Sequence, residues 1–129
     1  MVSRGVPVDV RARTTLPATV DSPAAARAFT RAAVAGVPVR IDDLTLVVSE
    51  LVTNALVHGT GDITLHVTGI DDGVRVEVGD DDPPPASLPV GNAPAAESGR
   101  GLLLVSRVAT AWGVRPDGGG KVVWADVAR

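Results

Sequence analysis

A glutamate and an asparagine stand four residues apart near the middle of the sequence, at Glu50 and Asn54. The surrounding stretch, residues 44–59, has apolar residues recurring at intervals of three and four, which predicts an amphipathic helix. On such a helix both polar side chains leave the same face, at the border of the apolar stripe. A carboxylate and a carboxamide placed this way either hold a metal ion and orient a water molecule, or form a solvated flank. The spacing alone favours the solvated flank.

The predicted helix has recognisable start and stop signals. Asp42 or Asp43 is suited to cap its N-terminus, and Gly59 is suited to end it. A second helix is expected before it, over residues 24–35, because the segment 21–23 offers a capping aspartate followed by a proline. The sequence therefore predicts two helices in succession, of which the second carries the acid and the amide.

Alternation of apolar and polar residues predicts strands on both sides of these helices. The first stretch reads as an edge strand, and the remaining four form two antiparallel hairpins with glycine-containing turns. The expected strands are 8–13, 63–68, 74–78, 113–116 and 121–127. His66 falls on the polar face of the first hairpin, so we interpret it as a surface histidine.

A second group of polar and glycine residues follows the first hairpin. The strand ends at the acidic cluster 80–82, and residues 82–98 contain five of the ten prolines with no periodicity. A long irregular segment within a compact domain is typical of a functional lid or of disorder. Gly99 and Gly101 then open an apolar helix expected to run to about Trp112. Its first backbone amides form a ready anion site, although this feature alone favours a flexible turn with a serine cap.

Composition narrows the classes of function. The 129 residues fit one domain, 1–129, with a net charge of −3 at pH 7, only three aromatic residues and no cysteine. The negative charge and the lack of aromatic platforms argue against direct nucleic-acid binding. The absence of cysteine excludes disulfides and thiolate zinc sites. No apolar run reaches the length of a membrane span and no signal-peptide core is present, so we expect a cytoplasmic protein.

The order of these features resembles the Bergerat ATP-binding fold of the histidine kinase-like (GHKL) ATPase superfamily. Residues 49–59 are similar to its N box, residues 76–80 to its first glycine box, residues 98–104 to its second, and residues 120–124 to its closing strand. The resemblance covers residues 14–128 and is closest to small stand-alone bacterial regulators related to anti-sigma factor serine/threonine kinases. It implies an α+β fold: a two-layer sandwich with a mixed, mostly antiparallel sheet covered on one face by helices.

The resemblance assigns roles to the polar residues. Asn54 would bind the Mg²⁺ that bridges the phosphates of ATP, and Glu50 would be the general base or would position the attacking group. Asp80 would accept a hydrogen bond from the adenine amino group. The segment 82–98 would be the lid over the nucleotide.

The second glycine box would contact the phosphates. Its backbone would approach them at Gly99, Arg100, Gly101 and Leu102. His58, at the end of the N-box helix, is a further candidate for a phosphate contact. The simpler interpretation of His58 is a histidine stabilised by the helix dipole, and we prefer it.

Several positions depart from the family pattern. Asp82 stands where the family usually has glycine or serine, and Glu97 stands where the kinases carry an arginine that reaches the γ-phosphate. Arg100 is a candidate substitute for that arginine. Val122 lacks the hydroxyl that a threonine often brings to the nucleotide on the last strand. These changes weaken the case for catalysis more than the case for binding.

Three functions are therefore compatible with the sequence. Glu50 beside Asn54 favours an ATP-dependent serine/threonine kinase that phosphorylates an anti-anti-sigma (STAS-type) protein and sequesters a sigma factor. Glu97 and Val122 favour an ATP-gated protein-binding module without chemistry. The acidic cluster 80–82 favours an interaction scaffold without nucleotide, because it would repel phosphates. The relatives also imply a homodimer formed through a sheet edge.

Overall fold

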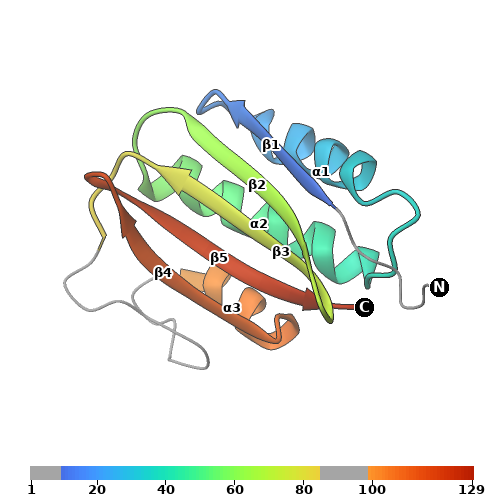
Figure 1. Ribbon diagram of the computed structural model, residues 1–129. Coiled ribbons are helices and arrows are strands. Elements are labelled where there is room, and N and C mark those ends of the chain that lie inside the picture. The colour runs from blue at the N-terminus through green and yellow to red at the C-terminus, as the bar shows by residue number, and fades with distance from the viewer. Residues whose placement is uncertain (1–9, 85–98) are drawn as a thin grey trace.

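A five-stranded antiparallel sheet carries helices on one of its two faces (Figure 1). The computed structural model describes residues 10–84 and 99–129. The elements in chain order are β1 (Arg11–Leu16), α1 (Ser22–Ala33), α2 (Ile41–His58), β2 (Ile63–Ile70), β3 (Gly73–Asp80), α3 (Gly99–Val108), β4 (Ala111–Asp117) and β5 (Gly120–Ala128). The strand order is β1-β2-β3-β5-β4, so β1 and β4 are the edges. This is the predicted two-layer α+β architecture.

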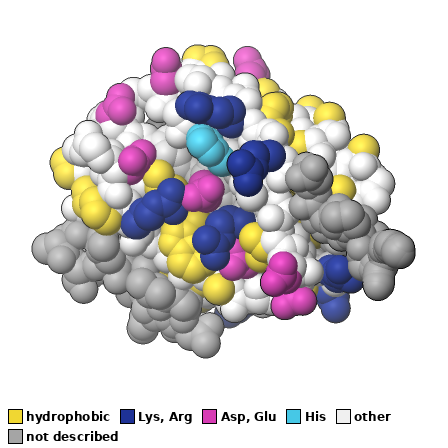
Figure 2. All heavy atoms as spheres, viewed as in Figure 1, with side chains coloured by type: hydrophobic (Ala, Val, Ile, Leu, Met, Phe, Trp, Pro, Cys, Tyr) yellow, Lys and Arg dark blue, Asp and Glu magenta, His cyan; other side chains and the backbone are white. Residues whose placement is uncertain are grey.

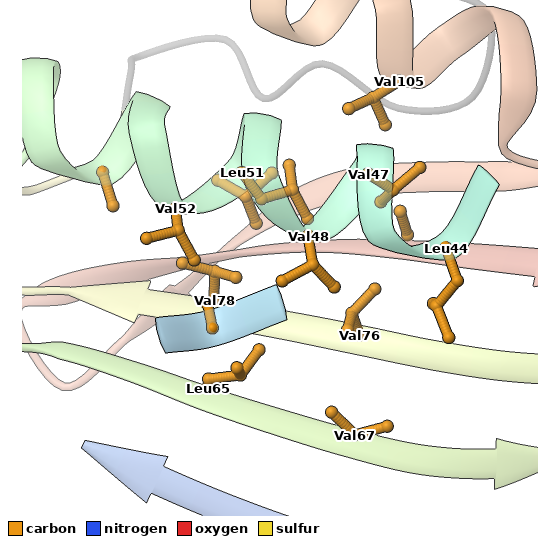
Figure 3. Close-up of a cluster of buried hydrophobic side chains, with 14 of the residues drawn as sticks. Leu44, Val47, Val48, Leu51, Val52, Leu65, Val67, Val76, Val78 and Val105 are labelled. Atoms are coloured by element: carbon orange, nitrogen blue, oxygen red, sulfur yellow. The ribbon is translucent and has the colours of Figure 1, made fainter. Parts of the chain in front are cut away.

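Helix α2 packs against the middle of the sheet and organises the core. Its apolar stripe faces inward-pointing residues of β2 and β3 (Figure 3). The residues that meet in this layer are Leu44, Val47, Val48, Leu51, Val52, Leu65, Val67, Val76 and Val78. All are almost completely buried. With aromatic residues so scarce, branched aliphatic side chains fill the interior, and β-branched valine also suits the strands.

The helices differ from the sequence prediction at their ends. Helix α1 begins at Ser22 rather than at residue 24, and α2 begins at Ile41 rather than at residue 44. The N-cap of α2 is Arg40, without a side-chain capping bond, so the prediction that Asp42 or Asp43 caps this helix was wrong. Both aspartates lie instead in the first turn, where the positive end of the helix dipole stabilises negative charge.

Strand positions are largely as predicted. Strand β1 is an edge strand, but it extends to Leu16, and residues 8 and 9 of the expected strand lie outside the described residues. Both hairpins are confirmed. Helix α3 ends at Val108, so the prediction that it continues to Trp112 was wrong. The chain turns into β4 because the backbone N–H and the hydroxyl of Thr110 both donate to the Asp126 carbonyl, and Trp112 is then buried in the core.

Within the described residues, none of the helices combines the length and the apolarity that crossing a membrane would require.

Leu51→Ala tests the central position of α2. Leu51 is fully buried against the sheet, so we expect truncation to lower the free energy of unfolding by about 2–5 kcal/mol, from lost burial and the cavity left behind. Leu46→Ala, on the exposed side of the same helix, is the matched control and should cost about 1 kcal/mol or less. Urea denaturation measures both. Equal losses in the two variants would contradict the packing of α2 described above.

Candidate functional site

Four element ends meet at one end of the sheet. The C-terminal half of α2, the last residue of β3, the first residues of β5 and the N-terminal end of α3 all lie on the same side of the molecule (Figure 1). The strands β3 and β5 pair so that Asp80 stands opposite Lys121. Three of the segments singled out in the sequence are therefore brought to one place, although they are up to about fifty residues apart in the chain.

Asp80 is the buried acid of this region. Its side chain is 1% exposed, and that of Lys121 is 10% exposed. Lys121 Nζ donates to Asp80 Oδ1 at 3.0 Å, and the backbone N–H of Asp82 donates to the same oxygen at 2.7 Å. A buried carboxylate needs such compensation, because burying an unpaired charge is very costly. The ammonium also lies 3.7 Å from Asp82 Oδ2, so it offsets two members of the acidic cluster.

The second carboxylate oxygen of Asp80 has a different environment. Oδ2 accepts no hydrogen bond from the described residues. Among those residues, Trp112 Nε1 is the one fully buried side-chain nitrogen or oxygen that lacks a hydrogen-bond partner. Within the described part of the chain, Oδ2 therefore remains an acceptor without a donor. The ion pair fixes the carboxylate and leaves one oxygen for an incoming hydrogen-bond donor.

Gly59 makes room for this carboxylate. A Cβ built on Gly59 would lie 2.6 Å from Cγ and from Oδ2 of Asp80, closer than real Cβ atoms approach other atoms. The glycine has φ of −99° and extended backbone, so it is not needed for a left-handed turn. The backbone N–H of Asp81 donates to the Thr60 carbonyl at 2.9 Å, which ties the end of β3 to the segment after α2. Gly59 does end the helix as predicted, but the reason is the approach of Asp80.

Glu50 and Asn54 lie on α2 as predicted, one turn apart and both half-buried. Neither side chain makes a hydrogen bond to another described residue, so both are available to a ligand. His58, one further turn along, is exposed.

Helix α3 packs beside α2. Val105 of α3 lies across from Val47 (Figure 3), and the two helices run in opposite directions (Figure 1). The N-terminal end of α3 therefore lies toward the half of α2 that carries Asn54.

The first turn of α3 contains the residues assigned to phosphate contact. They are Gly99, Arg100, Gly101 and Leu102. The first backbone N–H groups of a helix have no acceptor within the helix, and together with the dipole they favour an anion. The side chain of Leu102 is buried in the core, so only its backbone is available for binding. Of the expected lid, residues 85–98 lie outside the described residues.

Sequence reasoning missed Lys121 as a site residue. Val122, the position expected to correspond to the family's threonine, pairs with Gly79 and points to the opposite face of the sheet from Asp80. The inward residue at this end of β5 is Lys121. The alternation of inward and outward residues along the strands could have identified Lys121, because the first inward residue of β5 pairs with the last inward residue of β3.

Magnesium held mainly by phosphates is compatible with these residues. The described residues contain no group of three or more His, Cys, Asp or Glu side chains that could hold a metal ion on their own. Mg²⁺ in nucleotide sites is usually bound through one or two side chains, substrate phosphates and waters, so a full set of protein ligands is not required. Asn54 offers one carboxamide oxygen on the side of α2 that faces the start of α3.

Comparison with known proteins agrees with this geometry. The family model of the histidine kinase-like ATPase domain matches residues 16–127. The crystal structure of the RsbU and RsbW domains of Rv1364c from Mycobacterium tuberculosis has a similar fold, with a TM-score of 0.66, 22% sequence identity and coverage of 92% of this chain. This chain spans 33% of the length of that one. No curated protein sequence matches the chain at a significant level.

Lys121→Met tests the ion pair. The variant leaves Asp80 as an unpaired buried carboxylate, so we expect the free energy of unfolding to fall by about 3–5 kcal/mol. Arg115→Met is the control, because it breaks the exposed pair with Glu77 and should cost less than about 1 kcal/mol. Urea denaturation at neutral pH measures both. Removing the acid as well, in Asp80→Asn/Lys121→Met, should restore part of the loss; a Lys121→Met cost no larger than that of Arg115→Met would contradict the buried pair.

Proposed function

Because the chain belongs to the histidine kinase-like ATPase domain family, we propose that it binds Mg-ATP between α2 and the start of α3, with the adenine at Asp80. The observation that carries the proposal is the meeting of α2, the end of β3 and the start of α3 at one end of the sheet (Figure 1). Each of these ends supplies a different part of a nucleotide site. We further propose that the protein is a regulator that acts on a protein partner.

Asp80 recognises the base in this proposal. The Lys121 ammonium and the Asp82 N–H occupy Oδ1, so the carboxylate is held in one orientation. Oδ2, which has no donor among the described residues, accepts the hydrogen bond from the adenine amino group. The lack of a side chain at Gly59 keeps the approach to Oδ2 open.

Asn54 and the start of α3 bind the triphosphate. The backbone N–H groups of residues 99–102 donate to phosphate oxygens at the positive end of the helix dipole. Asn54 holds Mg²⁺ through its carboxamide oxygen. Bound Mg²⁺ supplies neutralisation of the phosphate charge that develops during transfer.

Glu50 is the candidate catalytic group. In the kinase form of the proposal, its carboxylate accepts the proton of a serine or threonine hydroxyl on the partner. The hydroxyl oxygen forms the new bond to the γ-phosphorus, and the bond from that phosphorus to the oxygen of ADP breaks. The resemblance to anti-sigma factor kinases favours an anti-anti-sigma protein as the acceptor and a sigma factor as the sequestered protein.

An ATP-gated binding module without phosphoryl transfer is the second candidate. Glu97 replaces the arginine expected near the γ-phosphate, and the Lys121 ammonium adds a positive charge at the base end rather than at the phosphates. Both features favour binding over chemistry. A scaffold that binds no nucleotide is less favoured, because Lys121 offsets the acidic cluster that motivated it.

A thermal-shift experiment tests nucleotide binding. Mg-ATP at a hundred times its Kd should stabilise the protein by about 2.7 kcal/mol, which for a chain of this length raises Tm by roughly 10 °C. Asn54→Ala and Asp80→Asn should abolish most of the shift, measured from each variant's own Tm. Asp62→Asn, an exposed acid in the turn after α2, should retain it. The proposal fails if Mg-ATP leaves the Tm of the wild-type chain unchanged.

Transfer of labelled phosphate from ATP to a STAS-type protein separates the two candidates. If Glu50 is the base, Glu50→Ala should reduce transfer by about 100-fold or more while the Mg-ATP thermal shift remains. A shift without any transfer by the wild-type chain would identify the binding module.

A further inference from the structure

The face of the sheet opposite the helices carries a concentration of arginine. Because β-strand residues alternate between faces, the strand residues between the buried valines point to this open face. The antiparallel register places them in rows across the strands. One row runs Arg11–Thr68–Arg75–Asp126, and the next runs Arg13–His66–Glu77–Trp124. Arg115 of β4 points to the same side, opposite Val122.

The charge of this face is opposite to that of the whole chain. Four arginines and three carboxylates (Glu77, Asp117 and Asp126) at the outward positions give it a net charge of +1 with His66 neutral, whereas the chain carries −3. The rest of the protein therefore carries −4 in total. Figure 2, which looks onto this face, shows Lys and Arg side chains gathered around a histidine.

The arginine side chains on this face are more exposed to solvent than the carboxylates that pair with them. The side chain of Arg75 is 39% exposed and that of Asp126 is 11% exposed; the values for Arg115 and Glu77 are 48% and 20%. Both carboxylates accept bonds from these guanidinium groups, at 2.7 Å and 2.6 Å. The hydrogen bond to Asp126 raises the pKa of Arg75, although burial acts against this. An approaching molecule thus meets guanidinium groups first.

An indole ring and a guanidinium group are stacked on the open face toward its β4 edge. Trp124 lies against Gly113, where an added Cβ would be 3.0 Å from the indole ring, and the Arg75 guanidinium lies 4.5 Å from the ring centroid on Trp124. Five strands about 4.8 Å apart make the face roughly 20 Å wide. Strands of 6 to 9 residues are roughly 20–30 Å long. The face therefore covers about 400–600 Å², which corresponds to the small interfaces of weak or transient complexes.

We propose that this open sheet face is a docking surface for an acidic protein, used transiently and separate from the nucleotide site. Opposite charge steers such a partner to the face and sets its orientation. The pairs already formed by Arg75 and Arg115 hold their guanidinium groups in place, so less side-chain freedom is lost on binding.

Other occupants fit the face less well. Single-stranded nucleic acid needs a series of exposed aromatic residues, but Trp124 is the one aromatic residue among the described outward strand positions and Arg75 lies over it. A membrane surface requires protruding apolar side chains as well as basic ones. A second copy of the chain would bring arginine rows of like charge together in a twofold contact.

The docking surface links to the nucleotide site through shared strands. Glu77 and Asp80 lie on opposite faces of β3, and Trp124 and Lys121 lie on opposite faces of β5. A partner on the open face therefore leaves α2 and the start of α3 accessible. The surface does not depend on nucleotide binding, so either proposal can fail without the other.

Titration of the full chain with a fluorescently labelled poly-glutamate peptide tests the surface. Arg11→Glu/Arg13→Glu should weaken binding by about tenfold or more, which corresponds to about 1.4 kcal/mol. Arg31→Glu/Arg107→Glu makes the same change in charge at exposed positions of α1 and α3, and it should change the affinity by less than about twofold. The intrinsic fluorescence of Trp124 should change on binding, and Trp124→Phe should lose this change while retaining most of the affinity. Neither double variant should alter the thermal shift with Mg-ATP.

Three results would overturn the assignment. Equal weakening by both double variants would mean that the peptide senses only overall charge. Tighter, Arg13-dependent binding of oligouridylate or of phosphatidylserine vesicles would reassign the face to nucleic acid or lipid. Self-association of the wild-type chain in analytical ultracentrifugation, abolished by Arg11→Glu/Arg13→Glu, would make the face a homodimer contact.

Discussion

The packing of α2 on the central strands is the constraint from which the rest of the structure follows. Its apolar stripe is fully buried against β2 and β3, so the helix can neither rotate nor slide without exposing valine and leucine to water. This fixes which side of α2 faces α3, and with it the position of Glu50 and Asn54. It also brings the end of the helix, at Gly59, against the end of β3. The polar residues thus owe their arrangement to an entirely apolar contact.

At that end of the sheet, burial of the Asp80 carboxylate costs free energy, but the same burial holds the carboxylate in one orientation for a ligand. Asp80 is nearly inaccessible, yet among residues 10–84 and 99–129 only one of its oxygens is engaged, by Lys121 and by the Asp82 backbone. A buried ion pair contributes little net stability compared with an apolar pair of the same size, because desolvation opposes the attraction. Its value here is orientation: a fixed carboxylate with one free oxygen is a selective acceptor. The open face of the same strands has a separate set of charges, so one sheet presents two chemically distinct surfaces.

Much of the fold was predictable because it depends on local patterns. The helical spacing of residues 44–59 and the alternation in both hairpins are set by burial on one side of each element, and the structure confirms them. The end of α3 was mispredicted, because Thr110 leaves the helix to bond with Asp126. The strand that contains Asp126 was predicted, but the local pattern does not reveal a contact with a residue 16 positions further along the chain. Lys121 was missed for a similar reason. Its role depends on pairing across β3 and β5, and Val122, one position further along, points to the other face. Asp80 and Gly59 were both singled out, but their contact was not foreseen.

A crystal structure of the chain with Mg²⁺ and a non-hydrolysable ATP analogue tests the central claim most directly. The account predicts the adenine amino nitrogen within hydrogen-bonding distance of Asp80 Oδ2, Mg²⁺ bound by Asn54, and the phosphates at the first turn of α3. Lys121 should remain paired with the other oxygen of Asp80. A nucleotide bound elsewhere, or one whose base makes no contact with Asp80, would contradict it.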